Sequence, residues 1–309
     1  MLHKVIVIGE MCEDILMHNP ESVEVMGMKV WAEDITVTAG GSASYTSEAL
    51  KHLGVDVNLC SVVGDDRMGK RLIDRMKNVG INCDMIKTLK NRKTTASMLI
   101  CSKAEKEFLG CSPMLPIELP DIEKLKGVDM VYIAGYMLYP ELWSDEAYAF
   151  FKELKKRNIL LALDVQMQPV NNFDAMKITK FDRILPLIDV LFVAKKEADQ
   201  IVGRKSAEEA GRIFVDLGCK SVVLKQGSDG AAIITGEGVR TIKNHPVDAY
   251  DTVGSGDVYG ASFCYGLLND WNIEKCGRFA SVFTALSLKR YQEYKEYPSF
   301  EEVSEIIKI

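Results

Sequence analysis

Short apolar runs rich in β-branched residues alternate with longer amphipathic runs along most of this chain of 309 residues. Buried strands are predicted over residues 5–8, 57–63, 131–134, 160–164, 190–193 and 221–224. Helices are predicted over residues 43–53, 67–78, 144–157 and 206–217, three of them ended by Gly54, Gly80 and Gly218. Apolar strands joined by helices indicate an α/β fold, in which a mostly parallel sheet is covered on both faces.

Two segments depart from this alternation. Residues 15–38 and 92–111 alternate polar and apolar side chains, which is typical of half-exposed antiparallel strands. They are predicted to project from the main sheet and to form a small β-sheet lid over its C-terminal edge. Because neither repeats nor a low-complexity linker interrupts the chain, we expect a single domain over residues 1–309.

Charge and composition limit the classes of partner. The formal net charge is −6, which argues against a general nucleic-acid-binding protein. No apolar window reaches the length of a membrane span, and the N-terminus lacks the apolar core of a signal peptide. The eight cysteines form no CxxC pair and the four histidines are scattered, so no zinc site is predicted. These features predict a cytoplasmic protein with reduced thiols.

The run Asp251-Thr-Val-Gly254-Ser255-Gly256-Asp257 precedes a stretch that can form a helix. Small residues let the backbone approach an anion, and the free N–H groups of a helix N-terminus attract it. A carboxylate at that position is poorly placed to bind phosphate but well placed to take a proton from an attacking hydroxyl. The pattern therefore predicts phosphoryl transfer. Taken alone, it fits better a common loop whose Asp complements the helix dipole.

Three further positions are candidates for ligand binding or capping. Gly40 and Gly41 open the first strong helix, where glycine permits either a special turn or close approach of a ligand. Asp14 follows the first strand, at the edge where α/β sheets bind ligands, and could accept hydrogen bonds from polyol hydroxyls. A solvated acid is the alternative there. Asp65 or Asp66 is predicted to cap the helix over residues 67–78.

The order of these motifs resembles that of the ribokinase-like (PfkB) sugar kinases. The resemblance rests on the Gly40-Gly41 helix start, the Gly64-Asp65-Asp66-x-x-Gly69 turn, the Lys225-Gln-Gly227-Ser-Asp-Gly230 turn and the Asp251–Asp257 box. It extends from residue 5 to about residue 303. It implies a three-layer α/β sandwich with a small lid, and transfer of phosphate from Mg-ATP to a hydroxyl of a sugar, a sugar derivative or a nucleoside.

The resemblance also implies roles for individual residues. Asp257 matches the catalytic base, and Gly254, Ser255 and Gly256 match the anion hole for the transferred phosphoryl group. Asp14, Gly40 and Gly41 match positions that hold substrate hydroxyls. Lys225, Gly227 and Gly230 belong to a turn that lines the nucleotide site. Glu197 matches an acidic residue that organises water around Mg²⁺.

Several positions depart from the family pattern. Tyr45 replaces an asparagine that contacts the sugar, and as a substrate-site residue it could stack on a ring or narrow the pocket. Ala194 replaces the asparagine of an Asn-x-x-Glu pattern, and Ser281 replaces one near the base, at the nucleotide site. Residues 165–169, Val-Gln-Met-Gln-Pro, lack the asparagine and arginine frequent in sugar-acid kinases.

Cation and partner predictions follow from the same comparison. The turn over residues 290–294 lacks a common glycine, which counts against K⁺ activation, although Asp251 and the Val253 carbonyl could form part of a monovalent-cation site. Arg92 and Lys93 could meet a substrate phosphate, but a solvated strand end is the favoured interpretation. The lid edges could pair between two chains, which leaves a homodimer through the lid open.

Three alternatives to a sugar kinase stay open at this point. Tyr45 could stack on a base, which keeps a nucleoside kinase in consideration. The changed asparagine positions fit a catalytically silent ligand-binding protein, although such a protein would have no need of Asp257 and the Gly-Ser-Gly turn. A dinucleotide-dependent oxidoreductase fits poorly, because residues 254–260 have G-x-G-x-x-x-G spacing far from the N-terminus.

Overall fold

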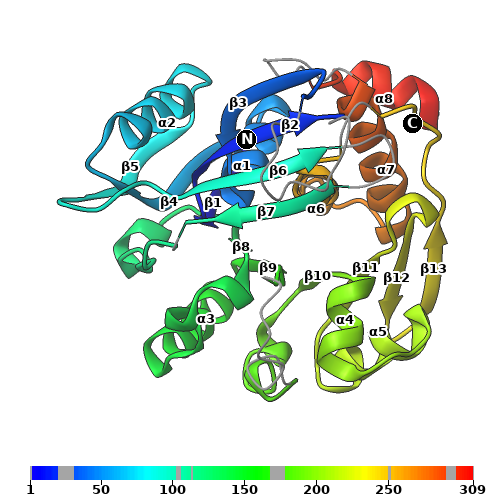
Figure 1. Cartoon of the computed structure of the whole chain (residues 1–309). Helices are drawn as coiled ribbons and strands as arrows, with labels where there is room; N and C mark the ends of the chain where they lie inside the picture. Colours follow the sequence, from blue (N-terminus) through cyan, green and yellow to red (C-terminus); the bar gives the residue numbers. More distant parts are fainter. Residues whose placement is uncertain are drawn as a thin grey trace.

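The computed structural model describes residues 2–19, 31–101, 106–112, 114–167, 178–249, 252–289 and 297–308. Within these residues, nine strands form one sheet and four form a smaller one (Figure 1). The large sheet has the order β13-β12-β11-β10-β9-β8-β1-β4-β5. The pairs from β5 through β11 are parallel, and β12 and β13 are added antiparallel at one edge. The predicted mostly parallel sheet is confirmed.

The strands of the large sheet are short and mostly apolar. Their bounds are Lys4–Gly9 for β1, Asp56–Gly64 for β4, Asn82–Leu89 for β5, Met130–Ala134 for β8, Leu160–Asp164 for β9, Val190–Ala194 for β10, Ser221–Lys225 for β11, Ala231–Thr235 for β12 and Gly238–Ile242 for β13.

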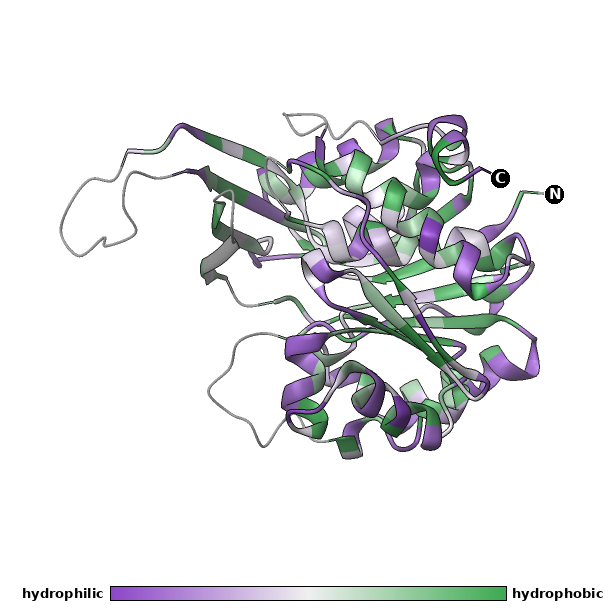
Figure 2. Cartoon of the chain, turned by 90° about the vertical axis from the view of Figure 1, so that its right-hand side faces the viewer, coloured by the Kyte–Doolittle hydropathy of each residue, from purple (hydrophilic) through white to green (hydrophobic). Residues whose placement is uncertain are grey.

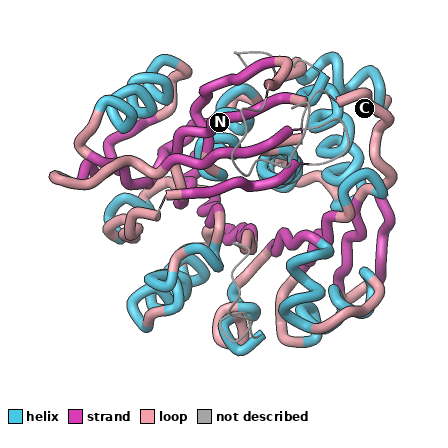
Figure 3. The backbone as a smooth tube through the Cα atoms, viewed as in Figure 1, coloured by secondary structure: helices cyan, strands magenta, loops and turns pink. Residues whose placement is uncertain are grey.

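Helices cover both faces of this sheet, as Figure 3 shows. One group consists of α1 (Ser42–His52), α2 (Arg67–Asn78), α6 (Ser255–Leu268), α7 (Ile273–Lys289) and α8 (Phe300–Ile307). The other consists of α3 (Asp145–Lys156), α4 (Lys195–Val202) and α5 (Ala207–Asp216). The three-layer prediction is therefore confirmed.

Successive residues of a central strand point into different cores. In β1, Val5 and Val7 pack into one apolar cluster, whereas Ile6 and Ile8 pack into the other. All four side chains are at most 1% exposed. Burial on both faces explains why these strands are continuous apolar runs, and the central strands are mainly green in Figure 2.

Element boundaries largely follow the local sequence signals. The helix predicted over residues 67–78 is α2, and Asp66 caps it by accepting a hydrogen bond from the Gly69 amide at 2.9 Å. Three strands were not predicted: β5, β12 and β13. The reason for β5 is its position at the sheet edge, where its half-exposed residues lack a continuous apolar run.

The smaller sheet is the predicted lid. It consists of β2 (Cys12–His18), β3 (Asp34–Gly40), β6 (Ala96–Cys101) and β7 (Lys106–Cys111), in the order β3-β2-β6-β7. Its strands begin and end slightly outside the predicted segment of residues 15–38, and residues 20–30 and 102–105 of the two segments lie outside the described residues. Arg92 and Lys93 are exposed, as expected of a strand end in solvent.

The prediction that the lid strands are all antiparallel is wrong for the central pair. The pairs β2–β3 and β6–β7 are antiparallel, but β2 and β6 are parallel. The main sheet explains this arrangement. Strands β1 and β5 run parallel in the large sheet, so their C-terminal ends lie at the same end of it. The chain passes from these ends into β2 and β6, which therefore run in the same direction.

All eight cysteines are free thiols, and six of them are buried. None of the described helices is long and apolar enough to cross a membrane.

Close packing between α6 and the sheet gives a test of the core. A Cβ added at Gly260 of α6 would overlap the hydroxyl of Tyr132, a fully buried residue of β8. We expect Gly260→Ala to lower the free energy of unfolding by about 1–3 kcal/mol, because the core is already filled. The measurement is chemical denaturation of the variant and the wild type.

The matched control is Gly236→Ala, since no atom lies within 4 Å of a Cβ at that position. Its free energy of unfolding should change by less than about 0.5 kcal/mol. In a Tyr132→Phe background, the cost of Gly260→Ala should shrink, because the overlapping hydroxyl is gone. An equal cost in both backgrounds would contradict the proposed overlap.

Candidate active site

Asp257 lies in the first turn of α6. The helix begins at Ser255, three residues before the start suggested by the sequence, and Gly254 adopts a left-handed conformation (φ 75°, ψ 1°) as the N-cap. The Asp257 side chain is nearly buried, with 7% exposure. The predicted base and the predicted anion-binding turn of residues 254–256 therefore belong to one helix N-terminus.

Gln166 joins this helix to the start of α1. Its Nε2 donates to Asp257 Oδ1 at 2.7 Å and also contacts Ser42 Oγ, in the first turn of α1. Gln166 lies two residues after the end of β9, and its φ of 40° is unusual for a residue other than glycine. Sequence reasoning noted this residue only as a departure from a family pattern. Its position after a strand at the C-terminal edge was the available signal.

Asp14 lies in the lid strand β2 and is 5% exposed. Tyr45 donates to its Oδ2 at 2.7 Å, and its Oδ1 accepts from Ser97 and, at 3.2 Å, from Cys12 Sγ. Protein groups therefore already occupy both carboxylate oxygens. In this structure, a sugar hydroxyl would have to share Asp14 with them.

The predicted glycine pair is required by two close approaches. A Cβ at Gly40 would overlap the Asp14 carboxylate. Gly41 has a φ of 88°, and a Cβ there would lie 2.5 Å from the Glu10 carbonyl oxygen. Protein atoms account for both glycines, which bring the start of α1 against β2 and the end of β1.

The Tyr45 ring does not lie open for stacking in this structure. It is 4% exposed and packs with Leu16, Leu99, Cys101 and Val253. Its hydroxyl donates to Asp14, so Tyr45 fixes the position of that carboxylate.

Glu10 is a titratable residue that the sequence analysis did not single out. Its Oε1 is fully buried and accepts no hydrogen bond from a described residue. Burial raises the pKa of Glu10 to about 8, and the negative charges of Asp14 and Asp257 add to the rise. The carboxyl is therefore mostly protonated at neutral pH and can donate a hydrogen bond.

A buried charge cluster lies beside the first turn of α6. Lys225, at the end of β11, donates to Asp164 Oδ2 at 2.6 Å, and Asp164 is fully buried. Burial disfavours the lysine's charge, but Asp164 and Glu197 together raise the pKa of Lys225 above its ordinary value. A Cβ at Gly256 would lie 3.2 Å from Lys225 Nζ, so the ammonium group faces the first turn of α6.

Glu197 is in the first turn of α4. Its carboxylate accepts from the Ala194 amide at 2.7 Å and the Met167 amide at 3.3 Å. Burial raises the pKa of Glu197 to about 7, with Asp164 adding to the rise and Lys225 opposing it. Glu197 and Lys225 are thereby brought together, as expected for two residues of one nucleotide and metal region.

The predicted turn of Gly227 and Gly230 connects β11 to β12. Asn244 Nδ2 donates to the Gly227 carbonyl at 2.6 Å. Ser281 of α7 contacts the same stretch: its Oγ accepts from the His245 amide at 2.9 Å and donates to the Lys243 carbonyl at 3.1 Å. Ser281 therefore holds the segment of residues 243–245, and its hydroxyl is already engaged by the backbone.

The described residues contain no evident cluster of side chains that could bind a metal ion directly. Among the described residues, no three His, Cys, Asp or Glu side chains are grouped closely enough to hold a metal ion. Asp251, the candidate for a monovalent-cation site, lies outside the described residues, as does the turn over residues 290–294. The prediction about K⁺ stays a prediction.

Comparison with known proteins decides the family. The description "pfkB family carbohydrate kinase" matches residues 2–299. The chain belongs to this family. A 5-dehydro-2-deoxygluconokinase of Clostridium botulinum (strain Alaska E43 / Type E3) is 28% identical over 283 residues, covering 87% of this chain and 84% of that protein.

Solved structures agree on the fold. A putative ribokinase from Agrobacterium tumefaciens has a TM-score of 0.85 at 18% identity, covering 100% of this chain and 98% of its own. The Arabidopsis thaliana ribokinase complexed with ribose and ATP has a TM-score of 0.80 at 21% identity, with full coverage of both chains. The pfkB kinase described here therefore has the ribokinase-like fold. It is a phosphotransferase, and the oxidoreductase alternative is set aside.

The charge state of Glu10 predicts a pH-dependent stability. Its folded pKa of about 8 lies above its ordinary value of 4.5, so the folded state binds the proton more tightly than the unfolded state. Stability should therefore fall as pH rises from about 4.5 to 8, by at most about 1.4 kcal/mol per pH unit, and then level off. Glu10→Gln should remove this contribution.

The check is the melting temperature of wild type and Glu10→Gln measured between pH 5 and 9. The gain in stability of the variant over the wild type should grow with pH and become constant above about pH 8. Parallel curves would show that Glu10 titrates with an ordinary pKa. Glu123→Gln is a suitable control because Glu123 is exposed in a surface turn.

Proposed function

We propose that this pfkB kinase transfers the γ-phosphoryl group of Mg-ATP to a hydroxyl of a sugar or sugar derivative, with Asp257 as the general base. The observation that carries the proposal is the placement of a nearly buried Asp257 carboxylate in the same helical turn as Gly254 and Gly256. A hydroxyl that points at this carboxylate would lie next to the N–H groups of the turn. One element thus supplies both a proton acceptor and an anion hole.

Gln166 supports the proposed role of Asp257. Its amide donates a hydrogen bond to Oδ1 of Asp257 and so fixes the orientation of the carboxylate that would meet the substrate hydroxyl. A neutral donor holds the orientation of the carboxylate without pairing it with a full charge. Positioning of this kind is most of what phosphoryl transfer requires of a protein.

The nucleotide is proposed to lie toward Lys225 and the Gly227–Gly230 turn. The ammonium of Lys225, beside the first turn of α6, is suited to stabilise negative charge on the transferred phosphoryl group. Glu197 would hold Mg²⁺ through water, since Mg²⁺ keeps several waters and binds mainly substrate phosphates. Bound Mg²⁺ would neutralise charge on the phosphates. The ATP complex of the Arabidopsis ribokinase supports ATP as the co-substrate.

The acceptor pocket favours an uncharged group near Glu10. The charges that act on Glu10 are those of Asp14 and Asp257, both negative. A substrate carboxylate placed there would be repelled, whereas a hydroxyl or carbonyl oxygen could accept a hydrogen bond from the protonated Glu10 carboxyl. The similarity to 5-dehydro-2-deoxygluconokinases makes a keto-sugar acid a natural test, with its carboxylate directed away from Glu10.

The experiment is ADP release from Mg-ATP with ribose, fructose, 5-dehydro-2-deoxygluconate and adenosine as acceptors. Release with one sugar class is expected, and Asp257→Asn should lower kcat by about 10²–10⁴-fold because the proton acceptor is lost. Asp270→Asn is the matched control, because Asp270 is exposed just beyond the other end of α6. Release with adenosine alone would support the nucleoside-kinase alternative. ATP binding without any acceptor-dependent release would support a silent ligand-binding protein.

We also propose a homodimer through the lid. The outer face of the lid is apolar: Val37, Ile15 and Met98 lie in one row across three strands, and Ile35 lies beside Met17. Ile35, Val37 and Met98 are 57%, 49% and 41% exposed. An exposed apolar face of this kind on a β-sheet is typical of an interaction surface.

The proposed dimer predicts that Ile35→Lys produces monomers, because a charge would be buried between the two lids. Light scattering coupled to gel filtration measures the mass. Ile122→Lys is the control, since Ile122 is 44% exposed but lies in a turn outside the lid. A monomeric wild type, or a dimer that persists in Ile35→Lys, would contradict the proposal.

A further inference from the structure

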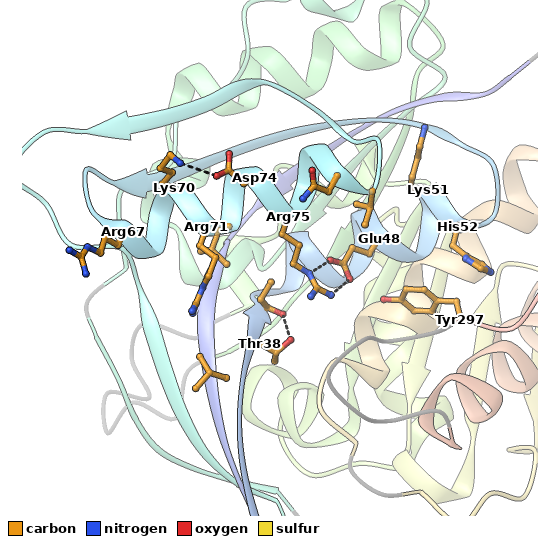
Figure 4. Close-up of a pocket in the computed structure, with 15 residues that line it drawn as sticks. Thr38, Glu48, Lys51, His52, Arg67, Lys70, Arg71, Asp74, Arg75 and Tyr297 are labelled. Atoms are coloured by element: carbon orange, nitrogen blue, oxygen red, sulfur yellow. Dashed lines mark hydrogen bonds and ion pairs between the residues drawn. The ribbon is translucent and has the colours of Figure 1, made fainter.

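A basic groove lies between α1, α2, β3 and Tyr297 (Figure 4). Its volume is about 880 Å³, which falls within the range of small-molecule sites. Neither the sequence motifs nor the proposed phosphoryl transfer uses it. We refer to it below as the basic groove.

Helix α2 lines the basic groove with one face. Arg67, Arg71 and Arg75 are spaced four residues apart, and Lys70 lies beside them. Residues at this spacing are neighbours on one side of a helix, separated by about one turn, or roughly 5–6 Å. The other side of α2 carries the buried residues Gly69 and Met76, so the helix cannot turn its cations elsewhere.

The groove is positive in an acidic chain. Five lysine or arginine side chains line it, against the carboxylates of Glu48 and Asp74, which leaves a formal charge of +3 apart from His52. The whole chain has a formal charge of −6. The groove is therefore positive although the protein as a whole is negative. This local positive charge favours an anionic ligand.

Only part of this positive charge is neutralised within the described residues. Arg75 donates two hydrogen bonds of 2.8 and 3.3 Å to the Glu48 carboxylate, which largely neutralises the positive charge of Arg75. Lys70 pairs with Asp74 at 3.4 Å in a mostly exposed contact, which stabilises little. Neither Arg67 nor Lys51 forms an ion pair with any residue that the structure describes.

Arg71 connects the groove to the lid. Its guanidinium pairs with Glu13 of β2, whose side chain is only 9% exposed, while Arg71 itself is 58% exposed. A guanidinium carries five N–H donors, so Arg71 can hold Glu13 and still present N–H groups to the groove. Glu13 is the neighbour of Asp14, and Thr38 and Ala39 of the groove lead directly into Gly40.

We propose that the basic groove is a second small-molecule site and that it binds a compound carrying two phosphate groups. Arg67 and Arg71, one helical turn apart, would each hold one phosphate through the planar fork that suits its oxygens. Lys51 of α1 lies at the other end of the groove, beside Gly80, and adds positive charge there. Leu72, Val79 and the Tyr297 ring supply apolar surface along the groove for the carbon skeleton of the compound. This site is separate from the phosphoryl-transfer site and does not depend on the function proposed above.

The experiment is calorimetric titration of the full chain with pyrophosphate and, separately, with fructose 1,6-bisphosphate, in the absence of Mg²⁺. Saturable binding of a bisphosphorylated probe is expected. Arg67→Ala should weaken it about tenfold or more, and this variant should fold normally because Arg67 is exposed. Arg71→Lys should also weaken it, since it keeps the charge beside Glu13 but loses the planar fork.

Two control variants make the result specific. Lys77→Ala removes an exposed cation of α2 that does not line the groove and should leave the affinity unchanged. Lys225→Ala removes the cation at the N-terminus of α6 and should also leave it unchanged. Binding lost in Lys225→Ala but retained in Arg67→Ala would overturn the proposal by assigning the anion to α6. Equal weakening by Lys77→Ala would reveal general charge attraction only.

Two further outcomes overturn the proposal. The first is the lack of saturable binding for both phosphate probes up to millimolar concentration. The second is equal binding of citrate, which would show that the groove accepts negative charge without selecting phosphate.

Discussion

Burial of both faces of the nine-stranded sheet is the constraint on which the rest of the structure depends. The inner residues of strands such as β1 are apolar and buried, so the polar side chains of β1 are confined to its ends. Polar side chains are therefore collected where β1, β9 and β11 end. Glu10, Gln166 and Lys225 all occupy such positions. The position of the candidate active site therefore follows from the burial of both faces of the sheet.

The same edge brings together acidic groups that would repel one another in a less ordered arrangement. Asp14 is satisfied by Tyr45, Ser97 and Cys12, and Asp257 by Gln166. Glu10, which has the least support, takes up a proton instead. Beside the first turn of α6, the ammonium of Lys225 offsets the charges of Asp164 and Glu197. Each carboxylate of the candidate site thus has a polar partner or a bound proton that offsets its negative charge.

Local signals were sufficient to predict most of the sheet and its helices. The period of α2 and the cap at Asp66 are written in adjacent residues, and the glycine-rich turn before Asp257 indicates its helix. Contacts between distant segments were not predictable in this way. The Gln166 bridge, the Tyr45–Asp14 hydrogen bond and the raised pKa of Glu10 each depend on residues that only the fold brings together. The parallel pairing of β2 with β6 was missed for the same reason.

That parallel pair has a consequence for how the protein folds. Each lid hairpin closes a short loop, but β2 can join β6 only after the chain has built β4 and β5, since Asp14 and Ser97 are 83 residues apart. Closing such a long loop costs more conformational entropy than closing a hairpin loop. The contacts that compensate this cost form only late in folding. The middle of the lid should thus be among the last parts to form and the first to separate during local opening, while the main sheet stays intact. Asp14, a residue of the candidate active site, therefore lies at the strand pair of the lid that is expected to open most easily.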